Sequence, residues 1–135
     1  IRPNGQLLCY PVISSGEKAH RGSFDALLGE ERCRDAEWLK KVSLEYQAGP
    51  QVPKTFIWHT VTDEMVPVEN TLYYISALKK AGVNFEAHLF PVGEHGISLA
   101  QREGATLGNQ NQIVPQAQSW MKLAKIWLDS LWDWE

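Results

Sequence analysis

The chain has 135 residues, which is enough for one domain and too short for two of ordinary size. Hydrophobic residues make up 44% and charged residues 21%, so the chain can bury a core and lacks the composition of a disordered polypeptide. The formal net charge is −3 and the 13 basic residues form no dense block, which argues against a nucleic-acid partner. The longest apolar run, Leu7 to Ile13, contains a proline and is too short to cross a membrane, so we expect no membrane partner.

The first half of the chain holds one predicted strand and a long polar connection. The apolar run Leu7–Tyr10 is typical of a buried strand in a parallel sheet. Residues 14–53 follow, and long connections of this kind often form the walls of pockets. Within the connection we expect two short helices, each preceded by a capping residue: Phe24–Leu28 after Ser23 and before Gly29, and Ala36–Val42 after Asp35.

The second half alternates strands and helices. Thr55–Thr60 is the clearest strand, because aromatic and β-branched residues dominate it. A helix is predicted over Asn70–Ala81, where leucine and isoleucine recur every three residues and Gly82 provides a stop. Alternating apolar and polar residues predict a third strand over Asn84–Pro91, and a last helix is predicted over Pro115–Trp132.

The order of these elements predicts the fold class. Strands that alternate with helices indicate an α/β fold in which three parallel strands form a sheet with helices on its faces. Ligands of such sheets bind beyond the carboxyl ends of the strands. We therefore expect functional side chains in the turns that follow the second and third strands.

Asp63 and His95 each follow one of two successive predicted strands. The helix between these strands makes a strand–helix–strand unit, whose crossover sets its two strands parallel and often adjacent. At a shared sheet edge the carboxylate can accept a hydrogen bond from the imidazole Nδ1–H, which leaves the other ring nitrogen free as a general base. Gly93 and Gly96 flank the histidine and allow its loop to turn tightly. An aspartate in this position can also simply cap a turn.

No catalytic role is assigned to the other histidines. His59 lies within a strand, where a histidine is usually packed and hydrogen-bonded, and His88 lies on the polar side of its strand. No pair of histidines or carboxylates has the spacing of metal ligands, so we predict no metal and no cofactor.

Five blocks of residues, spread along most of the chain, carry a further signal. They are Tyr10–Ser14, Ala19–Phe24, Ser43–Glu45, Phe56–Val68 and Phe90–Gly96. The last two are the most specific, since they contain Asp63-x-x-Val66-Pro67 and Gly93-x-His95-Gly96. Together the blocks resemble the C-terminal part of an α/β-hydrolase, similar to the bacterial esterase and lipase-like group that includes acetyl esterases acting on plant polysaccharides.

The resemblance implies a partial α/β-hydrolase fold that comprises the three parallel strands of the sheet's C-terminal half. It also implies that Asp63 and His95 are the acid and base of a Ser-His-Asp triad that cleaves small acyl esters, among them carbohydrate acetyl esters. Val66 and Ile97 lie close to these residues in the sequence, and we expect them to line the acyl pocket.

The nucleophile of that family is a serine in a G-x-S-x-G turn, and this motif does not occur in the sequence. We therefore interpret residues 1–135 as the C-terminal portion of one α/β-hydrolase domain whose nucleophile-bearing N-terminal portion is absent. Without the serine and the oxyanion donors that accompany it, we expect the chain alone to be inactive. We expect a cytoplasmic location by default, unless a secretion signal belonged to the absent N-terminal portion.

Three strands without the rest of a sheet would expose an apolar edge, so we expect self-association or a chain that completes the sheet. The substrate of the complete enzyme would be a small acyl ester. Two other interpretations stay open. One is a fragment of a dienelactone-hydrolase-like or oligopeptidase-like enzyme, which fold analogy alone does not separate from an esterase. The other is a non-catalytic α/β binding module.

Overall fold

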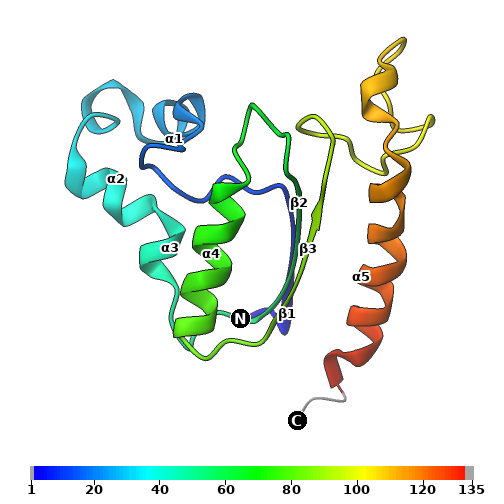
Figure 1. Ribbon diagram of the computed structural model, residues 1–135. Helices are drawn as coiled ribbons and strands as arrows, with labels where there is room; N and C mark the ends of the chain where they lie inside the picture. The colour runs from blue at the N-terminus through cyan, green and yellow to red at the C-terminus, as the bar shows by residue number, and fades with distance from the viewer. Residues whose placement is uncertain (1, 133–135) are drawn as a thin grey trace.

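The computed structural model describes residues 2–132, which form a three-stranded sheet with helices on both faces (Figure 1). The strands are β1 (Gly5–Cys9), β2 (Lys54–Thr60) and β3 (Phe85–Phe90). Their order in the sheet is β1-β2-β3, and both pairings are parallel. The predicted α/β class with three parallel strands is therefore confirmed.

The central strand β2 is the most deeply buried element. Residues 55–60 are all buried, because β2 pairs on both sides and is covered on both faces. Phe56 and Trp58 point to one face of the sheet, whereas Ile57 points to the other. Thr55, His59 and Thr60 are buried together with the apolar residues, so β2 has no solvent-exposed face.

Helices cover the two faces unequally, as Figure 1 shows. One face carries the helices α1 (Arg21–Arg32), α2 (Ala36–Val42), α3 (Leu44–Gln47) and α4 (Glu69–Lys80). The other face carries α5 (Trp120–Asp129), which is bracketed by the short 3-10 helices Pro115–Ser119 and Ser130–Trp132; a third 3-10 helix spans Gln110–Gln112. Among residues 2–132, no helix has both the length and the apolar character needed to cross a bilayer.

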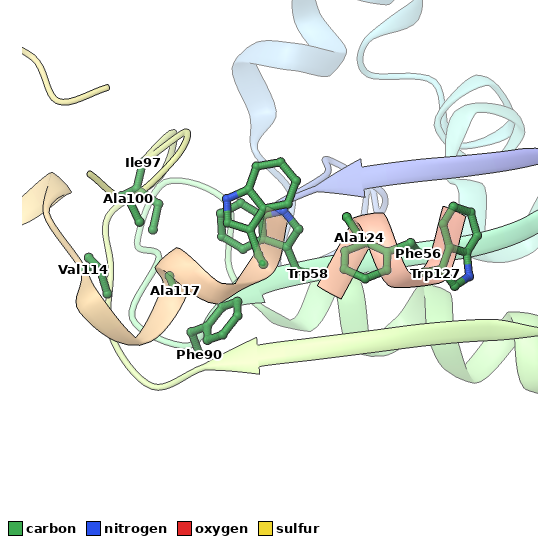
Figure 2. Packing of buried hydrophobic residues seen from close by; sticks show 10 residues of the cluster. Phe56, Trp58, Phe90, Ile97, Ala100, Val114, Ala117, Ala124 and Trp127 are labelled. Atoms are coloured by element: carbon green, nitrogen blue, oxygen red, sulfur yellow. The ribbon is translucent and has the colours of Figure 1, made fainter. Parts of the chain in front are cut away.

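Two hydrophobic clusters join these helices to the sheet. The larger cluster lies between the sheet and α5, where Figure 2 shows Phe56 beside Trp127 and Trp58 beside Phe90. The smaller cluster joins β2 to α4 through Ile57, Tyr74, Leu78 and Ile13. Burying one such side chain stabilises the fold by roughly 1.5–3 kcal/mol, so these clusters fix the sheet and with it the loops at its carboxyl edge.

The first helix differs from the prediction at its start. The residue before α1 is His20, so the predicted cap Ser23 is wrong; Ser23 lies within the first turn of the helix, and its hydroxyl hydrogen-bonds to His20 Nδ1 at 2.9 Å. The predicted stop at Gly29 is confirmed, because this glycine has φ 72° and interrupts the helical backbone. The predicted cap Asp35 is also confirmed, since Oδ1 accepts hydrogen bonds from two amides in the first turn of α2.

The last helix is α-helical over only part of the predicted span. The residues before Trp120 form a 3-10 turn that begins at Pro115, where the missing N–H of proline needs no partner. Turns of this tighter kind are frequent at the ends of α-helices. The predicted helix is thus confirmed in place, while its two ends are 3-10 rather than α.

A buried asparagine connects the loop after β1 to the start of α4. Asn70 Oδ1 accepts hydrogen bonds from the amides of Ile13 (3.0 Å) and Ser14 (2.9 Å). Its Nδ2 donates to the carbonyl oxygens of Lys18 (2.9 Å) and Pro67 (3.0 Å). The side chain is 0% exposed and uses both polar atoms twice, so it fixes the loop after β1 relative to α4.

Candidate active site

Asp63 lies in the turn that leaves the carboxyl end of β2. Its Oδ1 accepts hydrogen bonds from the backbone amides of Met65 (3.0 Å) and Val66 (2.8 Å), which is the local bonding typical of an aspartate in a turn. The side chain is fully buried. The second oxygen, Oδ2, is left for partners from other segments of the chain.

The loop that carries His95 is attached to the same edge of the sheet. The carbonyl oxygen of Gly93 accepts hydrogen bonds from the hydroxyls of Thr60 (2.9 Å) and Thr62 (3.2 Å), and its N–H donates to Thr62 Oγ1 at 2.9 Å. Gly93 has φ 146°, and a Cβ atom there would lie 2.7 Å from Thr60 Cγ2. Gly96 has φ 75°, so the two glycines predicted to shape this loop both adopt backbone conformations that favour glycine.

Asp63 and His95 meet, as the strand–helix–strand unit predicts. His95 Nδ1 donates to Asp63 Oδ2 at 2.7 Å, and the imidazole is one-quarter exposed. Within residues 2–132 the structure gives His95 Nε2 no hydrogen-bond partner. The Tyr10 ring packs against the imidazole in a T-shaped arrangement at a centroid distance of 4.9 Å. An imidazole oriented by a buried carboxylate and free at Nε2 has the geometry of a general base.

The environment of Asp63 favours the charged carboxylate. Burial raises the pKa of this carboxyl, but hydrogen bonds from His59, the Val66 amide and His95 outweigh burial and hold the pKa below its ordinary value. The positive charge that His95 carries when protonated acts in the same direction. Asp63 can therefore stay ionised and stabilise an imidazolium at His95.

His59 is the contact that the sequence does not predict. It is buried and hydrogen-bonded, as expected of a histidine within a strand, but its Nε2 also lies 3.2 Å from Asp63 Oδ2. The only signal in the sequence is the spacing of four residues across the end of β2. His88 pairs with Glu86 at 2.7 Å and lies away from this cluster.

An open cavity of about 850 Å³ lies beside His95. Its walls come from the two loops at the carboxyl ends of β2 and β3 and from residues 110–116. The other two predicted site residues do not line this cavity: Val66 is 1% exposed and Ile97 is 0% exposed. The predicted contact of these two side chains with an acyl group stays a prediction. Among the residues described, no group of three histidines, cysteines or carboxylates is arranged to bind a metal ion.

The sequence comparison assigns the family. Residues 28–111, more than half of the chain, match the prolyl oligopeptidase family. The chain belongs to this family. Its fold is that of the α/β-hydrolases, as the resemblance of its motifs predicts.

Two curated proteins are similar to this chain. Endo-1,4-beta-xylanase B of Butyrivibrio fibrisolvens is 40% identical over 102 residues, which are 76% of this chain and 16% of that protein. Acetylxylan esterase of Xylanibacter ruminicola is 30% identical over 125 residues, which are 90% of this chain and 25% of that protein. The chain therefore spans a quarter or less of the length of either relative.

The fold is also similar to that of solved hydrolases. The acetyl ester-xyloside bifunctional hydrolase of Caldicellulosiruptor lactoaceticus is 42% identical and superposes with a TM-score of 0.83. The match covers 96% of this chain and 43% of that one. The arrangement of strands and helices in this chain is thus the arrangement found in part of a hydrolase.

Proposed function

We propose that this chain supplies the acid and base of a serine esterase that removes small acyl groups from carbohydrate. The observation that carries the proposal is the pair formed by His95 and the buried Asp63, with His95 Nε2 free. The serine nucleophile and the oxyanion donors would come from residues outside this chain, since the sequence has no G-x-S-x-G motif.

In the complete enzyme His95 would move protons at Nε2. It would take the serine hydroxyl proton as Oγ attacks the ester carbonyl carbon, and would give that proton to the alcohol oxygen as the ester C–O bond breaks. In the second half, His95 would take a proton from water, whose oxygen attacks the acyl-enzyme, and would return it to the serine as the carboxylic acid leaves. Asp63 would orient the imidazole and stabilise its protonated form in both halves.

The cavity and the relatives support a carbohydrate ester as substrate. Amide and carboxylate side chains of Glu94, Gln110, Asn111 and Gln112 line the cavity, and such groups suit the hydroxyls of a sugar. The names of two similar proteins state acetyl ester hydrolysis, one of them on xylan. We propose that Val66 and Ile97 line the acyl pocket of the complete enzyme, because both are buried and lie within three residues of Asp63 and His95, the catalytic dyad.

Sheet pairing is proposed to complete the enzyme. Within residues 2–132, β1 pairs with β2 alone, so one edge of β1 can accept a further strand. We propose that this strand belongs to the nucleophile-bearing portion, and that this chain by itself self-associates through the free edge of β1.

The test compares the chain with the full-length product of its gene, on p-nitrophenyl acetate and on acetylated xylooligosaccharides. We expect no turnover by the chain alone, and turnover by the full-length protein that falls at least about 10³-fold in His95→Ala. His88→Ala is the matched control, since His88 bonds only to Glu86 among the residues described, and should keep full activity. Turnover by the chain alone that depends on His95 would overturn the proposal, as would a full-length protein indifferent to His95→Ala.

The family assignment favours a second candidate, a peptidase, because prolyl oligopeptidases are defined by that activity. The same dyad can serve either reaction, since acyl transfer from an amide also needs a base at His95 Nε2. Peptide p-nitroanilides distinguish the candidates: faster cleavage of these amides than of acetyl esters by the full-length protein would favour the peptidase.

A further inference from the structure

A second histidine lies behind the acid of the dyad. His59 projects from β2, is 0% exposed and uses both ring nitrogens. Its Nδ1 lies 2.8 Å from the hydroxyl of Thr71 on α4. Its Nε2 lies 2.8 Å from the carbonyl oxygen of Val66 and 3.2 Å from Asp63 Oδ2.

The partners of His59 decide which nitrogen carries the hydrogen. Both neighbours of Nε2 are acceptors, so Nε2 must be the N–H and must donate to them. Nδ1 then accepts from the Thr71 hydroxyl, which can donate. The two acceptors at Nε2 therefore select the tautomer that directs an N–H at the carboxylate of Asp63, and the Thr71 hydroxyl fits this tautomer because it can donate to Nδ1.

Each of the two carboxylate oxygens of Asp63 thereby accepts two hydrogen bonds. Oδ1 accepts from two backbone amides, and Oδ2 accepts from His59 as well as from His95. A purely packing role for His59 does not account for this arrangement, because an apolar side chain would fill the same place without the cost of burying an imidazole. The Val66 carbonyl oxygen alone would satisfy the hydrogen bonding of Nε2, so the further contact with Asp63 is not needed to bury the imidazole.

We propose that His59, oriented by Thr71, is a positioning residue that fixes Oδ2 of Asp63 where the Nδ1–H of His95 meets it. The inference rests on the proposed function, since positioning matters only if His95 acts as a base. Small displacements of a catalytic group carry large kinetic costs, of the order of 100-fold per ångström. Loss of one of several bonds to Asp63 should cost less than that.

The test uses two amide substitutions of His59 in the full-length protein. His59→Gln can place an N–H near the position of Nε2, whereas His59→Asn reaches only the position of Nδ1 and can bond to Thr71 but not to Asp63. We expect His59→Asn to lower kcat about 10-fold with KM unchanged, and His59→Gln to recover most of that loss. Rates are divided by the concentration of active sites, measured as the amount of protein whose serine reacts with a fluorophosphonate, so that unfolded protein is excluded from kcat.

Thr71 provides an independent pair of variants: Thr71→Val preserves the volume of the side chain, and Thr71→Ser preserves its hydroxyl. Thr71→Val should lower kcat about threefold or more, and Thr71→Ser, which keeps the hydroxyl, should match the wild type. Nitrogen-15 NMR of His59 should show Nδ1 without and Nε2 with a hydrogen in the wild type. Equal kcat for wild type and His59→Asn would overturn the inference; if His59→Asn does not fold, equal kcat for wild type and Thr71→Val would do so.

The outcomes keep the two proposals apart. A wild-type full-length protein that does not hydrolyse acyl esters refutes the proposed function, whatever the variants do. A wild type that is active and depends on His95, together with variants of His59 and Thr71 that keep its kcat, refutes only the positioning role.

Discussion

Replacing Asn70 with alanine should destabilise the fold strongly, because this side chain serves two buried backbone donors. In Asn70→Ala the amides of Ile13 and Ser14 lose the oxygen that accepts their hydrogen bonds. Each buried donor left without a partner costs about 1–3 kcal/mol, so the free energy of unfolding should fall by about 2–6 kcal/mol. The carbonyl oxygens of Lys18 and Pro67 also lose the hydrogen bond that Asn70 Nδ2 donates, which makes a loss of about 2 kcal/mol a lower bound.

Urea unfolding of the full-length protein, followed by tryptophan fluorescence and circular dichroism, measures this change. The control is Asn111→Ala, the same substitution at an exposed site where the amide bonds to Glu94, and its effect should stay within about 0.5 kcal/mol. The slope of free energy against urea should not change in either variant. A loss below about 1 kcal/mol in Asn70→Ala, or a loss equal to that of the control, would show that the buried amides find other partners.

Two further predictions concern the dyad. The pKa of the Asp63 carboxyl is lower in the folded chain than its ordinary value, so its stabilisation is complete above the unfolded pKa of about 3.9 and is lost as pH falls through the folded pKa. Urea titrations from neutral to acidic pH should show a steeper loss for wild type than for Asp63→Asn, and parallel curves would contradict this. Gly93→Ala should lower stability by about 1–3 kcal/mol and reduce kcat, since a Cβ atom there meets Thr60. Gly104→Ala, where the nearest atom is 3.6 Å away, is the control, and equal effects would refute the steric argument.

Local sequence patterns were sufficient to predict the sheet, whereas the prediction that Asp63 pairs with His95 also rested on the resemblance of their motifs to those of α/β-hydrolases. The strands and α4 lie within about two residues of their predicted bounds, because aromatic and β-branched residues dominate β2 and Gly82 follows α4 with φ 71°. The contact between Asp63 and His95 agrees with the crossover rule, since the two residues lie in the loops that follow adjacent parallel strands.

Contacts that depend on how a helix is rotated against the sheet could not be predicted. His59 bonds to Thr71 because α4 turns that threonine toward β2, and the period of apolar residues in α4 does not indicate which polar residue faces inward. Asn70 bonds to an amide 57 positions earlier in the chain, beyond the reach of any local pattern. Ser23 misled the prediction of the start of α1 because a serine in the first turn of a helix looks like a cap in sequence.

Asp63, His95, His59 and Thr71 all lie between the start of β2 and the loop that follows β3. Asp63 and His95 are 32 positions apart, and His59 and Thr71 lie on the same segment. The connection between β1 and β2, with α1, α2 and α3, lies outside it. Insertions and deletions in that connection can therefore accumulate without changing the distance between carboxylate and imidazole. The carboxylate of Asp63 and the imidazole of His95 can therefore be inherited as a single unit while the connection between β1 and β2 varies.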